Sequence, residues 1–483
     1  MRCSASPIPS SIAAWAWETT SSSAQSGHRF RCPPHSCDNR KRVQNELRNT
    51  IGIDFGTTNS SVAFAQDGQV RMVSFPLGTG GETFSSRSLL YLERQMHAPR
   101  KPVSVWTGPL GIEKYLAHDG FSDEAQGRLI QSLKSYLSAR TLTGTEIFGK
   151  QYRFEDLVAR ILANLRLRAS EALGFEVKRA IAGRPVMFVG AENEDDNAFA
   201  ENRLRSAFEQ AGFTDVTFAM EPVAAAYAYE SAVERDELVL IGDFGGGTTD
   251  FSLLRVGPAA RASGQLQVLG NSGVGIAGDA FDARIVRRLI SPALGSESVT
   301  LSAGKKLPVL PAWVYANLER WHTLSFLRTH ATMDMLRMAE KRAAAKKAPE
   351  REQIAALITI VEHDLGYRLH QAVQRVKVEL SRHEQAEFVL HAELLHLRAA
   401  VTRTQFEEWI SPELERMSES LDGLLQDTGI AAHQVDRVFL TGGTSLVPAV
   451  RRIFTSRFGE DRVQSGEAFT SVAYGLALMA AQE

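Results

Sequence analysis

Two stretches decide the fold of this chain: GIDFGTTNS at 52–60 and IGDFGGGTTDFSLL at 241–254. In both, an apolar run ends in Asp-Phe-Gly, starting at Asp54 and at Asp243, and a turn of small residues leads into a second apolar run. Two such runs joined by a short Gly-rich turn predict a strand–turn–strand hairpin. The repeat is too widely spaced for a solenoid, whose period is roughly 20–50 residues. It therefore predicts a duplicated domain with two halves that face each other.

The chemistry of these turns favours phosphate binding. A turn of Gly, Thr and Ser exposes consecutive backbone N–H groups, which form nests for phosphate oxygens. Asp54 and Asp243 end the preceding strands and could hold Mg²⁺ through water, because Mg²⁺ keeps several waters and uses few protein ligands. A third Gly-rich turn at 442–444 lies between a predicted strand and a helix and could take the nucleoside end. No Walker or Rossmann glycine motif is present.

The composition limits the classes of protein to which this chain can belong. The 483 residues are 44% hydrophobic and 23% charged with a net charge of −2, which is typical of a soluble globular protein without a surface for nucleic acid or anionic membrane. No apolar run is long enough to cross a membrane. The three cysteines all precede residue 40, so the rest of the chain has no thiol chemistry, and we expect a cytoplasmic location.

Residues 1–49 differ from the rest of the chain. The first fifty residues hold nine serines and seven Lys or Arg but three acidic residues, and show no hydrophobic period. A cleaved transit peptide, a disordered tail and a start site chosen too early all fit this composition. We therefore exclude the segment from the predicted fold.

Periodicity predicts the other elements. Helices are expected at 154–173, at 198–211 before Gly212, from Pro222, at 448–458 and at 471–481, and a helix-rich region is expected at about 296–382. Within that region, apolar residues keep three- and four-residue steps from Ile354 to Leu380, which predicts one long helix. Strands are expected from Ala180 and, as the last one, at 435–440. The acidic run 192–196 is interpreted as a solvated loop.

Six motifs, in this order, resemble the nucleotide-binding domain of the DnaK-type heat-shock chaperones. They are GIDFGTTNS (52–60), MEPVAAAYAY (220–229), IGDFGGGTTDFSLL (241–254), AGDAFD (277–282), TGGTSLVP (441–448) and VAYG (472–475). The resemblance runs from about residue 50 to the end. It implies an α/β protein of the actin-like ATPase fold, with two ribonuclease-H-like lobes, 50–238 and 239–483, around a nucleotide cleft. It also implies ATP or ADP with Mg²⁺ as ligands and a protein partner or client.

The same resemblance assigns roles to single residues. The catalytic residues are Lys134, Glu221, Asp243 and Thr248. Lys134 orients the attacking water, and Glu221 couples the nucleotide to lobe movement. Asp54 and Asp243 hold Mg²⁺ through water, and Pro185 is the switch proline. The remaining nucleotide contacts are Gly56, Thr57, Thr58, Asn59, Gly245, Gly246, Gly247, Gly278, Lys377, Ser381, Gly442 and Gly443.

The chain also departs from the family pattern. The stretch between Asp282 and Gln374 is longer than in the family and predicts a helical insertion at about 296–372. By the resemblance, the positions that face the adenine base are altered: Gln374, Val378 and Leu446 stand where the family has glutamate and two arginines. No sequence for a peptide-binding β-sandwich follows the last helix, so the chain resembles the short, clamp-less YegD-like members.

Two function classes follow from these residues. The first is a slowly ATP-hydrolysing, chaperone-like switch that signals to a partner protein, and the second is a non-hydrolysing nucleotide-binding scaffold or actin-like filament. Intact Asp54, Asp243, Thr248 and Glu221 favour the first, because a scaffold would tolerate their loss.

Overall fold

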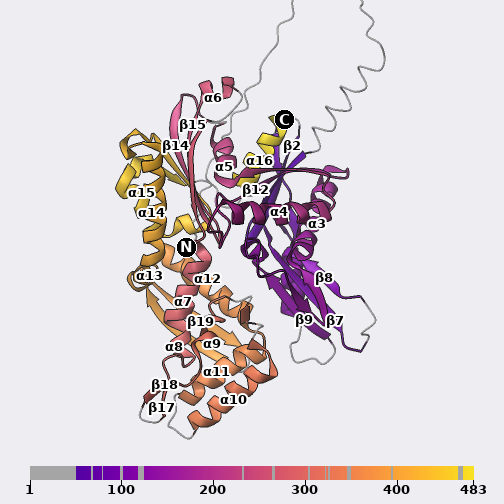
Figure 1. The fold of residues 1–483 in the computed structure, drawn as a ribbon, viewed down its shortest axis with the longest axis vertical. Coiled ribbons are helices and arrows are strands. Elements are labelled where there is room, and N and C mark those ends of the chain that lie inside the picture. Colours follow the sequence, from indigo (N-terminus) through magenta and orange to yellow (C-terminus); the bar gives the residue numbers. More distant parts are fainter. Residues whose placement is uncertain are drawn as a thin grey trace, which may run out of the picture. The chain divides into compact units, whose positions relative to one another are not determined.

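The structure is a computed structural model (Figure 1). It describes residues 50–482 except 67–68, 79, 98–101, 118–124, 231–232, 264–266, 303–304, 321–322, 325–326, 345–349, 393–394 and 466–470. The predictions made for residues 1–49 lie outside the described residues.

The first sheet is built around the first predicted hairpin. Its central strand β1 pairs in parallel with β12 and antiparallel with β2; β13 continues the parallel side and β3 the antiparallel side, giving the order β13-β12-β1-β2-β3 with β6 also on β2. The strands are β1 (Thr50–Phe55), β2 (Asn59–Gln66), β3 (Gln69–Met72), β6 (Ser86–Arg87), β12 (Arg179–Arg184) and β13 (Asp215–Met220).

The second sheet repeats this plan. Its central strand β14 pairs in parallel with β21 and antiparallel with β15; β22 continues the parallel side and β16 the antiparallel side. The strands are β14 (Glu237–Phe244), β15 (Thr249–Val256), β16 (Gln267–Val274), β21 (Arg437–Thr441) and β22 (Val463–Ser465). Both predicted hairpins are therefore confirmed, and their equivalent neighbours agree with a duplicated domain.

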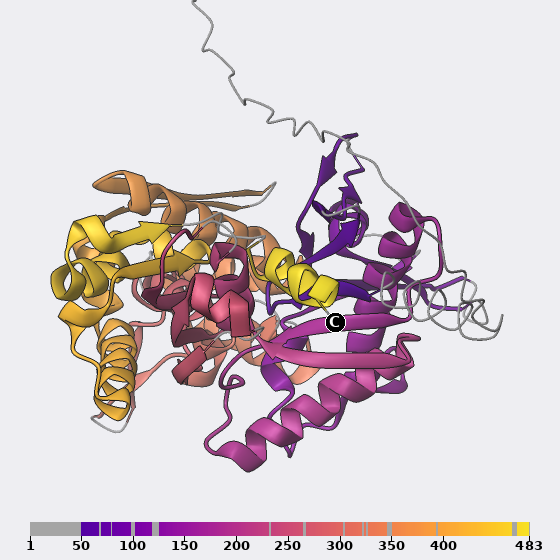
Figure 2. The same cartoon turned by 90° about the horizontal axis from the view of Figure 1, so that it is seen from above.

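Two helices join the sheets. Helix α16 (Ser471–Gln482) packs on β1, β2 and β12 and on α5 (Glu221–Glu230), and α5 in turn contacts β14 and β15 (Figure 2). The packing is close, because a Cβ on Gly475 would lie 1.7 Å from the carbonyl oxygen of Ala224. The final helix, which the predicted boundary assigns to the second lobe, thus lies on the first sheet.

Smaller elements surround the first sheet. Helix α3 (Phe154–Leu173) has the predicted limits, and Gly174 ends it with φ of 75°, a conformation that glycine adopts without strain. The others are β4 (Phe75–Pro76), β5 (Glu82–Thr83), β7 (Leu89–Gln95), β8 (Ser104–Thr107), α2 (Gly108–Ala117), β9 (Ala125–Gln131), η1 (Leu133–Tyr136), β10 (Gly144–Ile147), β11 (Lys150–Arg153) and α4 (Glu194–Gln210).

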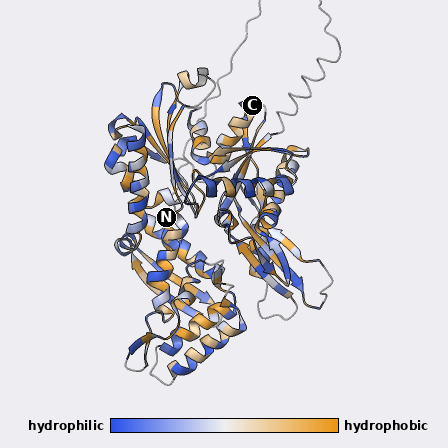
Figure 3. Cartoon of the chain, viewed as in Figure 1, coloured by the Kyte–Doolittle hydropathy of each residue, from blue (hydrophilic) through white to orange (hydrophobic). Residues whose placement is uncertain are grey.

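The second sheet carries a mostly helical set of elements. They are α6 (Pro258–Ser263), α7 (Gly278–Ile285), η2 (Val286–Ile290), α8 (Ser291–Ala293), β17 (Val299–Ser302), β18 (Lys305–Pro308), α9 (Ala312–Ala316), α10 (His330–Ala344), α11 (Glu350–Glu362), α12 (Gly366–Arg382), β19 (Gln385–Ala392), β20 (Leu395–Thr402), α13 (Arg403–Trp409), α14 (Ser411–Thr428), η4 (Ala432–Gln434), η5 (Gly443–Leu446), α15 (Pro448–Phe458) and η6 (Glu460–Arg462). Their apolar sides join one buried cluster with the second sheet, while hydrophilic residues occupy the other sides of the helices (Figure 3).

Four sequence interpretations need correction. Only the start of the acidic run lies outside a helix: Asn193 is the N-cap of α4 and accepts the Asp196 N–H at 3.0 Å, and residues 194–196 form the first turn, where acidic side chains stabilise the helix N-terminus. The start of the helix-rich region is the hairpin β17–β18. The apolar period from 354 to 380 spans two helices, which Asp364 separates with φ of 49°. The last strand is β22.

Among the described residues, no helix combines the length and the apolar character needed to cross a bilayer.

Candidate functional site

An acidic cluster lies where the two central strands end. Asp54 and Asp243 are the second-last residues of β1 and β14, and Asp243 is 9% exposed. Burial raises the pKa of both carboxyls, and the neighbouring Glu221 carboxylate raises it further. Carboxylates whose charges are held close together in a buried site favour a cation between them.

Lys134 and Glu221 form a buried ion pair beside this cluster. The Lys134 Nζ donates to Glu221 Oε1 at 2.6 Å, and the two side chains are 6% and 9% exposed. Lys134 lies in η1 and Glu221 begins α5, so elements far apart in the sequence supply the pair. The positive charge of Lys134 also lowers the pKa of both Asp54 and Asp243 against the larger effect of burial. The predicted catalytic lysine is therefore adjacent to both predicted metal-binding carboxylates.

The turns of the two hairpins face each other. A Cβ on Gly246 would lie 2.4 Å from Thr58 Oγ1, and one on Gly247 would lie 3.1 Å from Thr57 Oγ1. The second turn therefore tolerates only glycine at these positions. The Thr58 hydroxyl is buried and finds no hydrogen-bond partner among the described residues, which leaves it available to a ligand oxygen.

The remaining residues of these turns keep them in shape. Gly245 N donates to the carbonyl oxygen of Thr248 at 3.0 Å and so closes the second turn. A Cβ on Gly56 would lie 2.3 Å from the carbonyl oxygen of Asn59, so the first turn is equally tight. The Asn59 side chain accepts from Arg87 Nη1 at 3.2 Å.

Asp250 is a site residue that sequence reasoning missed. It lies opposite Asp243 on β15, and its Oδ1 accepts the backbone N–H of Val186 at 2.7 Å and of Met187 at 3.4 Å. Burial, followed by Glu221, raises its pKa to about 7. Because Val186 follows the predicted switch Pro185, Asp250 links the second sheet to that turn. Asp250 lies inside the second hairpin motif, so the sequence did carry a signal for it.

The predicted nucleoside side forms around Gly278. A Cβ there would meet Thr444 Oγ1 at 2.7 Å and Lys377 Nζ at 3.2 Å, so this glycine lies between α12 and the third Gly-rich turn. Lys377 donates to the Gly278 carbonyl at 3.1 Å and pairs with Asp282 at 2.8 Å. Thr444 donates to the carbonyl of Gly245 at 3.2 Å, which connects this side to the second hairpin.

The third turn depends on a left-handed glycine. Gly442 has φ of 84°, and a Cβ there would lie 2.0 Å from the carbonyl oxygen of Phe244. Gly443 then begins η5. The Ser381 hydroxyl, by contrast, donates to the Lys377 carbonyl of its own helix at 3.0 Å.

The two positions expected to face the base are open. Val378 is 50% and Leu446 is 53% exposed, although both are large and apolar. Gln374, the third altered position, accepts from Arg87 Nη2 at 3.4 Å. Arg87 lies on β6 of the first sheet, so it spans from the first hairpin to α12. Sequence reasoning did not single out Arg87.

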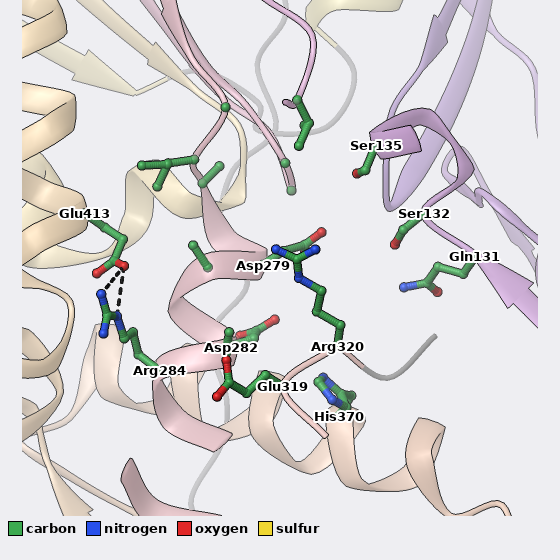
Figure 4. A pocket seen from close by; sticks show the side chains of 18 of the residues that line it. Gln131, Ser132, Ser135, Asp279, Asp282, Arg284, Glu319, Arg320, His370 and Glu413 are labelled. Atoms are coloured by element: carbon green, nitrogen blue, oxygen red, sulfur yellow. Dashed lines mark hydrogen bonds and ion pairs between the residues drawn. The ribbon is translucent and has the colours of Figure 1, made fainter. Parts of the chain in front are cut away.

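A pocket of about 280 Å³ adjoins the second turn (Figure 4). Gly246 and Gly247 form part of its wall, and Asp279 and Gln374 lie along it. Burial raises the pKa of Asp279, and the charges of Lys377, Arg87 and Arg320 oppose that shift. Asp279 lies inside the AGDAFD motif but was not singled out, whereas Gln131 and Arg320 belong to no motif that would have identified them.

The described residues hold no group of three or more His, Cys, Asp or Glu side chains positioned to bind a metal directly. Water-mediated binding by two aspartates needs no such group, because Mg²⁺ retains most of its water. The buried carboxylates with raised pKa and the unpartnered Thr58 hydroxyl fit a magnesium–phosphate group. Asp54 and Asp243 would hold the metal through water, and Mg²⁺ would supply neutralisation of the phosphate charge.

Two matching sheets with facing glycine turns, an acidic cluster and a buried lysine make up the candidate site of this mixed α/β protein. The family model described as Hsp70 protein matches residues 50–308 and 352–482. The chain belongs to the Hsp70 family, and this membership implies the actin-like ATPase fold.

Family membership gives a general activity. Hsp70 proteins are ATPases that bind ATP or ADP with Mg²⁺ and act on client proteins. An ATP-binding, chaperone-like function is therefore supported for this chain. The match skips residues 309–351, which fall within the predicted insertion.

Proposed function

We propose that this protein is a Mg²⁺-dependent, slowly hydrolysing ATPase in which the nucleotide controls the relative position of two lobes and thereby signals to a protein partner. The observation that carries the proposal is the buried Lys134–Glu221 pair next to Asp54 and Asp243. Phosphoryl transfer to water needs little covalent help and depends on positioning and charge stabilisation. The pair and the facing turns provide both.

Each element has a distinct task in this proposal. The second turn and the Thr58 hydroxyl bind phosphate oxygens; the Thr58 hydroxyl is a donor without a hydrogen-bond partner among the described residues. Lys134 stabilises charge that develops on the terminal phosphate and orients the attacking water. Glu221 holds the Lys134 ammonium in place through the 2.6 Å hydrogen bond and, as the first residue of α5, lies on the helix that contacts both sheets.

The link between the sheets supports lobe movement. Asp250 accepts the N–H groups after Pro185, and Glu221 lies close enough to raise the pKa of Asp250. A change of charge near Glu221 therefore acts on a contact between the second sheet and the Pro185 turn. This gives the nucleotide a route to lobe position and so to a partner.

The test separates binding from hydrolysis. Calorimetric titration with ATP, with and without Mg²⁺, and single-turnover hydrolysis are measured for the wild type, Lys134→Met and the exposed control Lys178→Met. Lys134→Met should reduce hydrolysis about 100-fold or more while ATP binding changes only a few-fold. The control should match the wild type in both measurements.

The outcomes also decide between the two function classes. Mg²⁺-dependent ATP binding without hydrolysis above the protein-free rate would favour the non-hydrolysing scaffold or filament. A wild type that binds no ATP would contradict both classes.

A further inference from the structure

Arg320 belongs to the part of the chain that the Hsp70 family model skips. It follows α9 in a turn that is fixed on both sides: the Leu318 carbonyl lies 2.8 Å from Nε2 of the buried His370, and Thr323 N donates to the Arg320 carbonyl at 2.8 Å. The backbone that carries Arg320 is therefore anchored to α12, while its side chain is exposed.

Among the described residues, the Arg320 guanidinium is an unpaired cation on the second-sheet side of the pocket. It lines the pocket with Gly246 and Gly247 and extends past Asp279 (Figure 4). Within the described chain it forms no hydrogen bond or ion pair. The neighbouring arginines differ, since Arg284 pairs with Glu413 at 2.7 Å and Arg287 with Glu319 at 2.7 Å.

The opposite wall supplies uncharged polar groups. Gln131 is only 4% exposed, points into the pocket, and its Oε1 has no hydrogen-bond partner among the described residues (Figure 4). Ser132 is equally buried and has φ of 59°, a strained conformation for a residue other than glycine. Ser135 adjoins Lys134 in sequence and would lie 3.5 Å from a Cβ on Gly247.

We propose that Arg320, together with Gln131 and Ser135, binds a phosphate group in this pocket, next to the second glycine turn. The inference rests on the proposed ATPase function and adds to it a contact from the segment outside the family match. The guanidinium and the Ser135 hydroxyl can donate to phosphate oxygens, and the unpartnered Gln131 Oε1 can accept from a protonated phosphate oxygen. A charged phosphate oxygen would give the Arg320 guanidinium the partner that it lacks within the described chain.

Asp279 limits the protonation state of that phosphate. Its carboxylate lies near Gly246 and repels a fully ionised phosphate, but it accepts a hydrogen bond from a protonated phosphate oxygen or from a ribose hydroxyl. Inorganic phosphate keeps a protonated oxygen near neutral pH, whereas the terminal phosphate of ATP is largely ionised when Mg²⁺ is bound. The bound group has two sources: the terminal phosphate of ATP, or the inorganic phosphate that hydrolysis releases.

Calorimetry distinguishes these sources. ATP, ADP, and inorganic phosphate added to the ADP-loaded protein are titrated into the wild type, Arg320→Gln and the control Arg342→Gln, an exposed arginine of α10 in the same unmatched segment. If the terminal phosphate of ATP is bound, Arg320→Gln weakens ATP about fivefold to thirtyfold and ADP less than twofold. If inorganic phosphate is bound, the variant keeps both affinities but loses phosphate binding to the ADP-loaded protein.

A second variant tests the same proposal in case Arg320→Gln does not fold. Ser135→Ala removes one hydroxyl from the opposite wall and should weaken the same titration as Arg320→Gln, by a few-fold. The inference is overturned if Arg320→Gln and Arg342→Gln agree in all three titrations while the wild type binds ATP. If the wild type binds neither ATP nor phosphate, the proposed function fails together with the inference.

Discussion

The two hairpins share one backbone plan and present different chemistry. In the first, Asp54 lies opposite Ser61 and the turn carries Thr57, Thr58 and Asn59. In the second, Asp243 lies opposite Asp250 and the turn is three glycines followed by threonine. The first hairpin thus offers side-chain donors, whereas the second concentrates carboxylates and exposes bare backbone. A duplicated fold can therefore divide metal binding and phosphate binding unequally between its halves.

The threonines of the first turn explain why the second turn carries glycines. Thr58 Oγ1 occupies the space that a side chain on Gly246 would need. Each half consequently restricts the sequence of the other, although they are far apart along the chain. This explains why the donors and the bare backbone lie on opposite sides of the same site.

The largest expected effect is loss of metal-dependent stabilisation. At an ATP concentration a thousandfold above Kd, Mg²⁺·ATP should stabilise the wild type by about 4 kcal/mol. Asp54→Asn together with Asp243→Asn should abolish this gain in a thermal-unfolding measurement, because no carboxylate then orients the metal-bound water. Of the two single variants, Asp243→Asn should lose more of this stabilisation. The reason is that the second hairpin, where Asp250 lies opposite Asp243, concentrates the carboxylates.

The control is the exposed Asp427→Asn, which should keep the full effect. An undiminished shift in the double variant would contradict the metal site. Equal losses of stabilisation in the two single variants would show that the two hairpins contribute equally to metal binding.

The next effect concerns the affinity for the nucleotide base. We expect the base to lie only on the side of the second hairpin. By the resemblance, Val378 and Leu446 stand in place of two arginines, and because both are about half exposed we interpret them as an open apolar slot for the base. A guanidinium over the base contributes about 0.5–2 kcal/mol. Val378→Arg should therefore tighten ATP binding between about twofold and thirtyfold, and the wild type should discriminate weakly between ATP and GTP.

Calorimetric titration with both nucleotides measures these affinities. Val389→Arg, a change at an exposed valine of β19, is the matched control and should have no effect. If Val378→Arg binds ATP no more tightly, or if the wild type already rejects GTP, the open slot is the wrong interpretation.

The sequence was sufficient for the hairpins and insufficient for the pocket. Gly-rich turns between apolar runs carry a local signal, so β1–β2 and β14–β15 were predicted together with their aspartates. Arg320 and Gln131 meet only through long-range packing, which no local pattern reports. The break at Asp364 was hidden for another reason: apolar residues keep three- and four-residue steps across it, and a left-handed residue changes the chain direction without changing that spacing.

A smaller effect is a pH dependence centred on the second hairpin. Burial raises the folded-state pKa of Asp250 to about 7, above its ordinary value of 3.8. Between these values the folded state holds a proton that the unfolded state has released, so this group makes stability fall as pH rises from about 4 to about 7. Asp250→Asn should remove that part of the slope, because an amide does not titrate and its oxygen still accepts from Val186.

Urea unfolding at several pH values, compared between the wild type and Asp250→Asn, isolates this contribution from other groups such as His370. Ser61→Ala, at the matching position of the first hairpin, should keep the slope of the wild type. A slope that Asp250→Asn leaves unchanged would mean that the carboxyl is ionised throughout this range.

The smallest expected effect separates the two threonines of the turns. The Thr58 hydroxyl has no partner among the described residues, whereas the Thr248 hydroxyl hydrogen-bonds to Asp250 and lowers its pKa. Thr58→Val should thus leave the free energy of unfolding of the nucleotide-free protein unchanged and weaken ATP binding about fivefold, the value of one neutral hydrogen bond. Thr248→Val should instead cost about 1 kcal/mol without any nucleotide, because it leaves a buried carboxyl with one donor fewer. Urea unfolding and calorimetry on both variants measure the two quantities. A loss of nucleotide-free stability in Thr58→Val equal to that in Thr248→Val would show that the Thr58 hydroxyl is already paired within the protein, and the first hairpin would then offer no donor reserved for phosphate.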